Sequence, residues 1–434
     1  MIKKALVVLL VLVSALLLAC GGGTGGSVSL GGGGSSGGGG GYGGSAGAGA
    51  GSGAGGGAGS GGSGGGGSGS PGSGGTGIYT VFVGSIDGFG SIIVDGVHHD
   101  IATATIDIQD ATSLQLGMTT RITGTSTDGL ITNTATQIVS AADLRGTVSG
   151  LDVGDGTVGS LQVMGVLVQT DSSTIFDGTG LTGLATLHNA DNVQIYGLPG
   201  AAGYLRATRI ERLALPGAPV VTGSITHLNA VARSFALGSL TVNFAAATFA
   251  GNLEEASLAN GQIVRVRGVI APAAGILAAT KVEPWYAVPA TEGAPLGLVG
   301  IITDFGSLSD FKVMGTKVDA SAALISGGPS RSIGDGVKVE LTGVISGGVL
   351  RAGKLRLRYI PGTGGPAKFD VTGAVGNYTS AASFKVQGQS IDASGTSVTF
   401  INGTASGLRN GVRLAVTGSK VVSGVLVADR VQFD

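Results

Sequence analysis

The chain repeats one short pattern five times after Gly77, and this repetition limits its fold more than any other feature. Each copy has a Gly-x-Leu turn, shortened by one residue in the first copy, followed by a segment with alanine near its start. Successive turn glycines lie 74, 72, 73 and 76 residues apart along the 434-residue chain. They are Gly129, Gly203, Gly275, Gly348 and Gly424. Five matches in phase predict tandem copies of one supersecondary unit.

Two more elements recur in every copy. A segment before each turn alternates apolar and polar residues, as in Val264 to Arg267, and a period of two predicts a strand with one buried face. Nearer the start of each copy lies a predicted hairpin, because glycine at its turn supplies the positive φ that a tight hairpin needs. The five hairpin turns carry Asp95-Gly96, Met164-Gly165, Leu237-Gly238, Met314-Gly315 and Gln387-Gly388.

Each copy therefore contains five or six short predicted strands and no convincing helix. An open sheet of this size would leave two unpaired edges, and closing it into a barrel removes them. We expect an all-β protein with a tandem array of five small antiparallel barrels of the SH3-like or OB-like class. The repeats are expected at residues 78–141, 142–215, 219–285, 295–360 and 367–434, and are called repeats one to five below.

Proline marks the connections between repeats. Seven of the 11 prolines fall there, and proline favours connections because it lacks the backbone donor that a central strand needs. The connection between repeats one and two, Ser140 to Asp143, is very short and has no proline. We therefore expect repeats one and two to be closely coupled.

The order of these elements resembles a known family. The copies read Val-x-Gly-x-Val, a glycine hairpin, Leu-x-x-Gly-x-x-Val-x-Val-x-Gly, Gly-x-Leu and Ala-x-x-Ile, most clearly in repeats four and five. This order is similar to the bacterial domain-of-unknown-function family 5666, and the resemblance covers about residues 78 to 434. It implies tandem domains in secreted proteins and lipoproteins, and it implies no catalytic residues.

The N-terminus carries a different pattern. Two lysines precede an apolar run from Ala5 to Leu16, which is shorter than the roughly 20 residues that span a bilayer. Leu17, Leu18, Ala19 and Cys20 follow, and Cys20 is the only cysteine of the chain. The pattern resembles a bacterial lipoprotein signal peptide. Residues 1–19 are therefore expected to be a signal peptide, with Leu17, Leu18 and Ala19 recognised by the signal peptidase.

The resemblance to lipoproteins implies a lipid anchor at Cys20. Its sulfur would carry a diacylglycerol and its new amino group an acyl chain, and several chains hold a protein on a membrane more firmly than one. Gly21, rather than an acidic residue, follows Cys20. In bacteria with two membranes this resembles the signal for transfer to the outer membrane. We expect a lipid-anchored protein of the bacterial cell envelope, facing the periplasm or the cell surface.

Residues 20–77 are expected to form the lipidated cysteine and a disordered tether. From Gly21 to Gly77 the chain has 35 glycines in 57 residues, and serine, alanine and threonine make up most of the rest. Such a segment cannot bury enough apolar surface to fold. It would hold the repeats away from the bilayer.

Charge and cysteine content narrow the function further. Removing Lys3 and Lys4 with the signal peptide leaves 23 of the 25 basic side chains, against 26 acidic ones. This balance gives no basic footprint for nucleic acid, so no nucleic-acid partner is expected. Because Cys20 has no second cysteine to pair with, packing alone must stabilise the repeats.

The histidines give no strong metal-binding pattern. The best candidate is His98-His99, but neighbours on a strand point to opposite faces, so the two side chains cannot easily share one ion. We expect this pair to lie at a solvated strand end. His188 and His227 are scattered over other repeats, and no histidine recurs where it would activate a serine. No metal and no cofactor are expected.

The acidic pairs are equally unpersuasive as catalytic groups. Asp152 and Asp155 lie in a predicted glycine-rich turn, where aspartate usually caps its own backbone. Glu254 and Glu255 lie in a predicted loop before a strand. We expect neither pair to act as a general acid or base.

Trp285 and Tyr286 form the most unusual aromatic pair of the sequence. They are candidate ligand contacts, because aromatic rings of this kind can pack against sugar rings. The alternative is a hydrophobic plug at the connection between repeats three and four. The alternative is favoured, since prolines flank the pair on both sides.

These observations predict a non-enzymatic envelope lipoprotein. It would present its barrels for adhesion, scaffolding or contact with envelope polymers, and repetition would convert weak single contacts into avidity. The alternative is a ligand-binding module that holds an oligosaccharide or peptide on one or more barrel faces. That alternative expects exposed aromatic clusters, whereas only 5% of the residues are aromatic.

Overall fold

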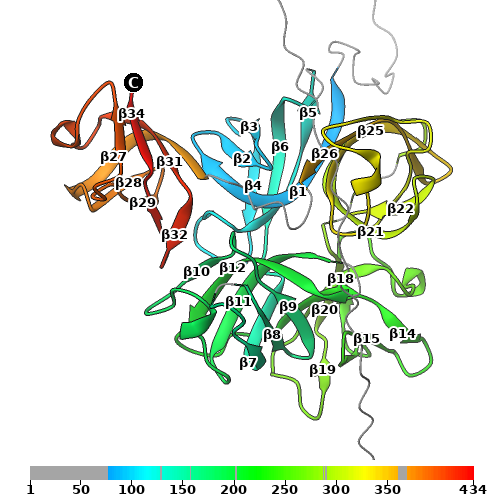
Figure 1. Ribbon diagram of the computed structural model, residues 1–434. Coiled ribbons are helices and arrows are strands. Elements are labelled where there is room, and N and C mark those ends of the chain that lie inside the picture. The colour runs from blue at the N-terminus through cyan, green and yellow to red at the C-terminus, as the bar shows by residue number, and fades with distance from the viewer. Residues whose placement is uncertain are drawn as a thin grey trace, which may run out of the picture. The chain divides into compact units, whose positions relative to one another are not determined.

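The computed structural model describes residues 77–434, apart from 128–129, 157, 201–202, 287, 289–290 and 360–368 (Figure 1). Within these ranges the chain forms β-strands and short 3₁₀ turns, with no α-helix. The all-β prediction is therefore confirmed. The predicted signal peptide, the predicted lipidation site Cys20 and nearly all of the predicted tether lie outside the described residues. In the ranges given above, no helical segment has the length and apolar character needed to cross a membrane.

Repeat one shows how the strands of a repeat pair. Its strands are β1 (Ile78–Phe89), β2 (Ile92–Val94), β3 (Val97–Asp100), β4 (Thr105–Ile108), β5 (Thr119–Ser126) and β6 (Thr132–Ser140). β1 pairs antiparallel with β2 and β5, β2 with β3, and β5 with β6. β6 runs parallel to β3 and β4. Pairing therefore passes from β1 through β2, β3, β6 and β5 back to β1, which makes a small barrel-like arrangement.

Repeats two and four use the same order. Repeat two contains β7 (Leu144–Asp152), β8 (Ser160–Val163), β9 (Val166–Gln169), β10 (Ile175–Asp177), β11 (Asn192–Pro199) and β12 (Leu205–Leu213). Repeat four contains β21 (Pro295–Ser307), β22 (Asp310–Val313), β23 (Thr316–Asp319), β24 (Leu324–Ser326), β25 (Lys338–Ser346) and β26 (Val349–Tyr359). The last strand of each, β12 or β26, is antiparallel to the fifth strand and parallel to the third and fourth.

Repeats three and five divide the longer strands into pieces. Repeat three contains β13 (Val220–Ser224), β14 (Thr226–Asn229), β15 (Ser234–Leu237), β16 (Leu240–Asn243), β17 (Thr248–Phe249), β18 (Ile263–Arg267), β19 (Ile276–Ala278) and β20 (Lys281–Pro284). Repeat five contains β27 (Phe369–Ser380), β28 (Ser383–Val386), β29 (Gln389–Asp392), β30 (Thr399–Ile401), β31 (Arg413–Gly418), β32 (Lys420–Val422), β33 (Val425–Val427) and β34 (Arg430–Phe433). The order of neighbours matches repeat one when the consecutive pieces are taken as bent strands.

A short 3₁₀ turn joins the fourth and fifth strands in four of the repeats. These turns are η1 (Leu184–Thr186), η3 (Glu255–Ser257), η4 (Ser330–Ser332) and η5 (Ala405–Gly407). Each turn ends at an extended residue, so the chain can enter the following strand directly.

The expectation of fully antiparallel barrels is wrong for the contacts of the last strand. A closed ring of five neighbouring strands cannot alternate direction throughout, because five is odd, so at least one neighbouring pair must run parallel. That pair is β3 with β6 in repeat one, and the equivalent pair is parallel in the other repeats. A parallel pair needs a long crossover, which the segment containing β4 and β5 provides.

The hairpin turns follow the expected chemistry in four repeats. Both turn residues have positive φ in Asp95-Gly96, Met164-Gly165, Met314-Gly315 and Gln387-Gly388, as the tight primed turns require. In repeat three, Leu237 pairs with Leu240, so the turn moves one residue further along the chain.

The shared glycine near the end of the fifth strand has a steric cause. In repeat four the pairing of β25 with β26 shifts register between Thr342 and Gly343, which marks a β-bulge. A Cβ at Gly343 would overlap the carbonyl oxygen of Arg351 on β26. Repeats one and two shift register in the same way at Gly124 and Gly197. Glycine therefore lets two backbones approach closely at the bulge.

The repeats do not form a simple row of separate barrels. β1 of repeat one runs parallel to β21 of repeat four over four residue pairs, and it meets β27 of repeat five at two more. β7 of repeat two pairs with β13 of repeat three, and β10 pairs with β32 of repeat five. A linear solenoid would contact only sequence neighbours. The expected row is therefore corrected to a body in which distant repeats touch.

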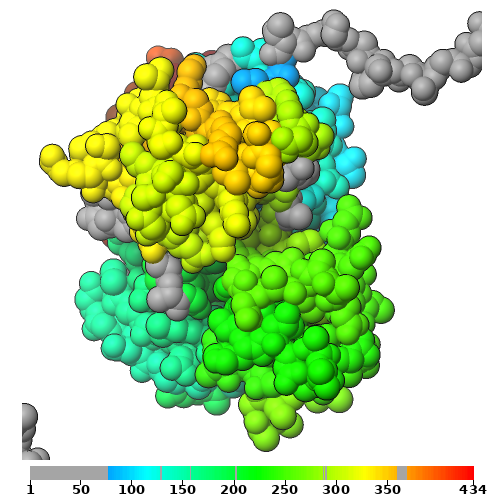
Figure 2. Space-filling model, turned by 90° about the vertical axis from the view of Figure 1, so that its right-hand side faces the viewer, coloured from blue at the N-terminus to red at the C-terminus, as the bar shows by residue number. Residues whose placement is uncertain are grey.

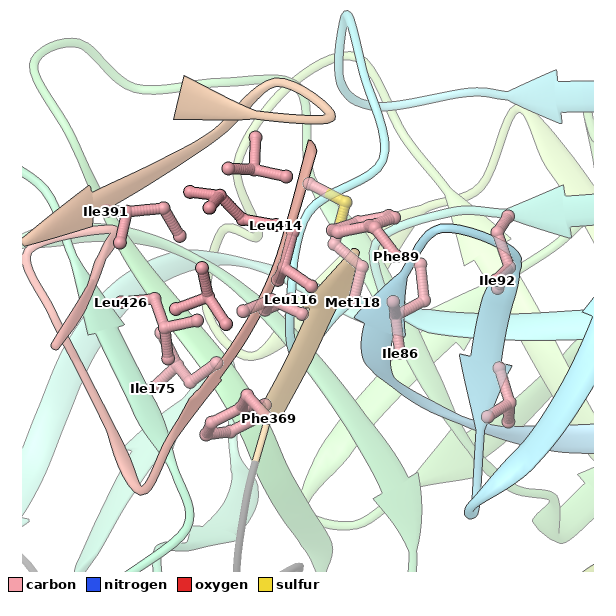
Figure 3. Packing of buried hydrophobic residues seen from close by; sticks show 14 of the residues in the cluster. Ile86, Phe89, Ile92, Leu116, Met118, Ile175, Phe369, Ile391, Leu414 and Leu426 are labelled. Carbon is pink, nitrogen blue, oxygen red and sulfur yellow. The ribbon is translucent and has the colours of Figure 1, made fainter. Parts of the chain in front are cut away.

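The apolar clusters also cross repeat boundaries. One cluster joins repeats one and five, and Figure 3 shows part of it, with Met118 of repeat one and Leu414 of repeat five. A second cluster merges repeats two and three. A third packs Val81 and Val83 of β1 against repeat four, whose atoms are yellow in the space-filling view (Figure 2). Burial of apolar surface thus stabilises contacts between repeats as well as the repeats themselves.

The bulge can be tested with two glycines of repeat four. Gly343→Ala should lower the free energy of unfolding by about 1–3 kcal/mol, because the added Cβ would push the backbone of β26 away. The matched control is Gly353→Ala on β26, where the nearest atom would lie 3.9 Å from the added Cβ. Chemical denaturation of the full chain measures both. Equal losses for the two variants would contradict the steric explanation.

Candidate functional site

A buried carboxylate joins repeats one, two and three. Asp143 lies at the end of the short connection between repeats one and two, and its side chain is fully buried. Its Oδ1 accepts hydrogen bonds from the Trp285 indole at 2.6 Å and from Arg265 at 3.0 Å. Its Oδ2 accepts from the Thr119 hydroxyl at 2.5 Å and from the backbone N–H of Gly197 at 2.9 Å. This side chain couples repeats one and two, as their short connection predicts, and adds repeat three.

Tyr286 completes this junction. The Arg265 guanidinium lies 4.7 Å from the centre of the Tyr286 ring, and cations are attracted to aromatic ring faces. The Tyr286 hydroxyl donates to the carbonyl of Thr119 at 3.0 Å and accepts from the N–H of Ala141 at 3.2 Å. Burial raises the pKa of Tyr286, so its hydroxyl stays protonated as the donor.

Trp285 and Tyr286 therefore lie inside the molecule rather than on a barrel face. The two side chains are 2% and 3% exposed, and their ring centres lie 5.0 Å apart. Contact of this pair with sugar rings, the less favoured of the two roles considered from the sequence, does not fit such burial, because neither ring presents a face to solvent. Both rings belong to the apolar cluster of repeat four, which fits the plug interpretation. The plug also reaches repeats one and two through Asp143 and Thr119.

A second buried carboxylate, Asp110, links the same three repeats. Asp110, between β4 and β5, pairs with Arg145 of repeat two at 2.7 Å and with Arg267 of repeat three at 2.9 Å. It also accepts from the backbone N–H of Ala142 at 3.0 Å. Burial alone would raise the pKa of Asp110, but the hydrogen bonds and charges of Arg267 and Arg145 lower it to about 2. Asp110 is therefore ionised at neutral pH.

The two histidines of β3 point to opposite sides, as predicted. His98 is exposed, and its Nδ1 lies 2.9 Å from the Ser91 hydroxyl. His99 is fully buried, with its ring nearly perpendicular to that of Phe82 and its Nδ1 3.0 Å from the side-chain nitrogen of Asn133. The expected solvated strand end holds for His98 and is wrong for His99, because the alternation of β3 turns His99 into the core. Burial lowers the pKa of His99 to about 3.

The remaining acidic candidates lie in turns. Asp152 accepts from the N–H of Gly154 at 3.2 Å, and Asp155 accepts from the N–H of Val158 at 2.7 Å. These are the backbone caps that the sequence predicts. 

The other candidates lie near the surface. Glu254 precedes η3 and Glu255 forms a partly exposed ion pair with Arg233. His188 and His227 are exposed. In the part of the chain that the structure describes, no three His, Cys, Asp or Glu side chains come together as a metal site would require.

A cavity of about 320 Å³ is lined by residues of repeats one, two, four and five. Asp87 and Asp95 of repeat one and Lys338 of repeat four are part of its lining. Lys338 forms an ion pair with Asp95, whose side chain is only 1% exposed. The Ser85 hydroxyl donates to Asp87 at 3.3 Å, a long hydrogen bond.

Two of the carboxylates that line this cavity, Asp87 and Asp95, share one nearby ammonium, that of Lys338. Burial raises the pKa of Asp87 to about 7, the charge of Asp95 adds to this increase, and the charge of Lys338 opposes it. Oδ2 of Asp95 is buried and makes no hydrogen bond to the described residues. A strongly shifted pKa beside a cavity is typical of a functional site. We therefore take this cavity as the candidate functional site.

Neither Asp87 nor Asp95 stood out as a site residue in the sequence. One signal was present: Asp95 occupies the first turn position of the hairpin, where repeats two and four have Met164 and Met314. A charged residue at a position that is uncharged in the other repeats marks a local difference in chemistry. The sequence could not predict that Lys338 lies beside Asp95. Repeat four reaches repeat one through the pairing of β1 with β21, and these strands are far apart along the chain.

The fold and the junctions define a class of protein: tandem small all-β domains that buried polar contacts join into one body. Residues 145–211, 222–283 and 372–432 match the sequence model of a domain of unknown function, DUF5666. The three matches are similar to this domain and are consistent with tandem copies of it. They fall in repeats two, three and five, and repeats one and four have the same strand order. No curated protein matches the chain.

The buried histidine predicts how stability depends on pH. The folded state resists protonation of His99 down to about pH 3, whereas the unfolded chain takes up a proton near pH 6.5. The wild-type protein should therefore lose up to about 1.4 kcal/mol of unfolding free energy per pH unit below 6.5, relative to His99→Gln. Denaturation at pH 4, 5 and 6 measures this difference.

The control is His98→Gln, one residue away on the exposed side of β3. It should keep most of the wild-type slope, because burial, the larger cause of the lowered pKa of His99, is unchanged, while the smaller contribution of the His98 charge is lost. Asp87 contributes a slope of opposite sign, because its raised pKa favours the folded state as pH falls from about 7, but it is common to all three proteins. The explanation fails if His99→Gln and wild type have parallel curves.

Proposed function

We propose that the protein is a non-enzymatic envelope lipoprotein that presents a fixed group of small β domains to envelope polymers. The five repeats would each be a small barrel of the SH3-like or OB-like class, with the boundaries expected from the sequence. Cys20 would carry the lipid, and residues 20–77 would hold the domains away from the membrane. Anchoring in the outer membrane is proposed because Gly21, rather than an acidic residue, follows Cys20.

The observation that carries this proposal is the Asp143 junction. Asp143 accepts four hydrogen bonds, and their donors come from three repeats. Asp110 adds charged contacts among the same repeats. Breaking a buried pair of this kind costs several kcal/mol, so the repeats are held in fixed positions. Fixed positions favour simultaneous contacts with a repetitive polymer, because less freedom is lost on the second contact.

A ligand-binding role for one or more barrel faces is the second proposal. The aromatic pair that suggested it is buried, so oligosaccharide or peptide binding would need other residues. The cavity beside Asp87 and Lys338 supports a role of this general kind.

Lipid attachment can be tested by labelling growing cells with radioactive palmitate. The wild-type protein should carry the label and partition with membranes, because the lipobox pattern places the acyl chains on Cys20. Cys20→Ser should lose the label and become soluble or remain unprocessed. A Cys20→Ser protein that still incorporates palmitate would contradict anchoring at this residue.

Presentation to an envelope polymer can be tested by sedimentation with isolated peptidoglycan sacculi. The Cys20→Ser chain should co-sediment, and adding Asp143→Ala should weaken its binding at least tenfold, because the repeats would lose their fixed spacing. Asp310→Ala, at an exposed site on β22, is the matched control and should bind as the parent does. Absence of co-sedimentation of the parent chain would contradict the proposal.

A further inference from the structure

The cavity beside Asp87 has more nearby negative charge than positive charge. Asp87 and Asp95 face the single ammonium of Lys338, which pairs with Asp95. Among the described residues, the hydrogen bonds to Asp87 are the long one from Ser85 and one from the backbone of Asp95. A buried carboxylate without a cation of its own is costly, so a second cationic group in the cavity would be strongly favoured.

The two arginines of the lining already face other carboxylates. Arg358 forms an ion pair with Glu340 of its own repeat, with a hydrogen bond of 2.7 Å. Arg206 lies 4.0 Å from Asp171 in repeat two. Asp171 also accepts from Ser173. The groups that act most strongly on the Asp87 carboxyl group are therefore Asp95 and Lys338, not these arginines.

The cavity also offers apolar walls. Ile93 of β2, Leu198 of β11 and Phe369 of β27 contribute to its lining. A volume of about 320 Å³ is at the lower end of the range for small-molecule sites, roughly 300–1,000 Å³. A short apolar stem can pack against these side chains while its polar end meets the carboxylates. Asp370, whose carboxylate accepts from Thr417, lies on the same lining.

Repeat one is the repeat in which the hairpin side chain is acidic. In repeat four a Cβ at Gly300 would overlap the Met314 side chain, so that methionine lies over the first strand. In repeat one Asp95 occupies the equivalent place over Gly84. An apolar side chain would be cheaper to bury than a carboxylate. Stability therefore does not explain why this position of repeat one carries the carboxylate of Asp95.

We propose that this cavity binds a small organic cation with a primary ammonium group and a short apolar stem. The ammonium would lie beside the Asp87 carboxylate, with Asp95 adding negative potential and Lys338 keeping its pair with Asp95. The stem would lie along Ile93 and Phe369. The first hairpin-turn residue is acidic in repeat one and not in the other four repeats, so one ligand per chain is expected.

Binding is tested by titration calorimetry of the full chain in detergent solution, with 5-aminopentan-1-ol as the probe. The neutral comparison is pentane-1,5-diol, which has the same length and lacks the charge. The amine should bind at pH 8 and bind about tenfold more weakly at pH 6, because the pKa of Asp87 is about 7 and the ionised fraction of its carboxyl group falls about tenfold between these two pH values. The charged groups that line the cavity with it are Asp95, Lys338, Asp171, Arg206, Arg358 and Asp370.

Asp87→Asn should weaken amine binding at least tenfold and remove its dependence on pH. Asp310→Asn, an exposed substitution outside the cavity, should leave both unchanged. Thermal unfolding checks that Asp87→Asn is folded. If that variant fails to fold, the comparison of amine with diol on the wild-type protein at the two pH values still decides.

Three results would overturn the proposal. They are equal binding of the diol and the amine, unchanged binding by folded Asp87→Asn, and no heat of binding from the amine at millimolar concentration. None of these results would alter polymer binding by the Cys20→Ser chain, so the two proposals fail separately.

Discussion

The buried carboxylate of Asp143 is the interaction on which the arrangement of repeats one to three depends. It accepts four hydrogen bonds, and the donors come from all three repeats. A charge with no exposure to water is tolerated only when its partners surround it, so the repeats must keep these donors in place. Trp285 fits the same logic, since it donates its indole N–H to Asp143 and covers the ion pair with apolar surface.

The repeats share backbone geometry rather than side-chain chemistry. The positions that recur most regularly are glycines of turns and bulges, and each has a steric reason, such as the close approach of Arg351 to Gly343. The recurring apolar positions fill the interior of each barrel-like unit. Polar residues at the junctions, such as Asp110 and Arg267, occur once each and connect particular repeats. The backbone of the repeat is therefore shared by all five copies, whereas the contacts that hold the copies together differ from one junction to the next.

The cavity beside Asp87 follows from the same division. The hairpin keeps its turn geometry whether its first residue is Asp95 or Met314, because positive φ is satisfied in both. The side chain at that position is consequently free to differ between repeats. In repeat one it places a carboxylate where Lys338 of another repeat can reach it. Chemistry in this protein thus arises where one altered side chain meets a neighbouring repeat.

The sequence by itself determined the strand-rich repeat, its turns and its phase, because periodicity and glycine positions reflect local backbone requirements. It also indicated that His98 and His99 point to opposite sides, since that follows from strand geometry alone. Only the tertiary structure decided that His99 is buried, that Trp285 and Tyr286 face inward, and that Asp95 pairs with Lys338. These features depend on contacts between residues as far apart as Asp95 and Lys338, and no local pattern encodes which repeat will lie beside another.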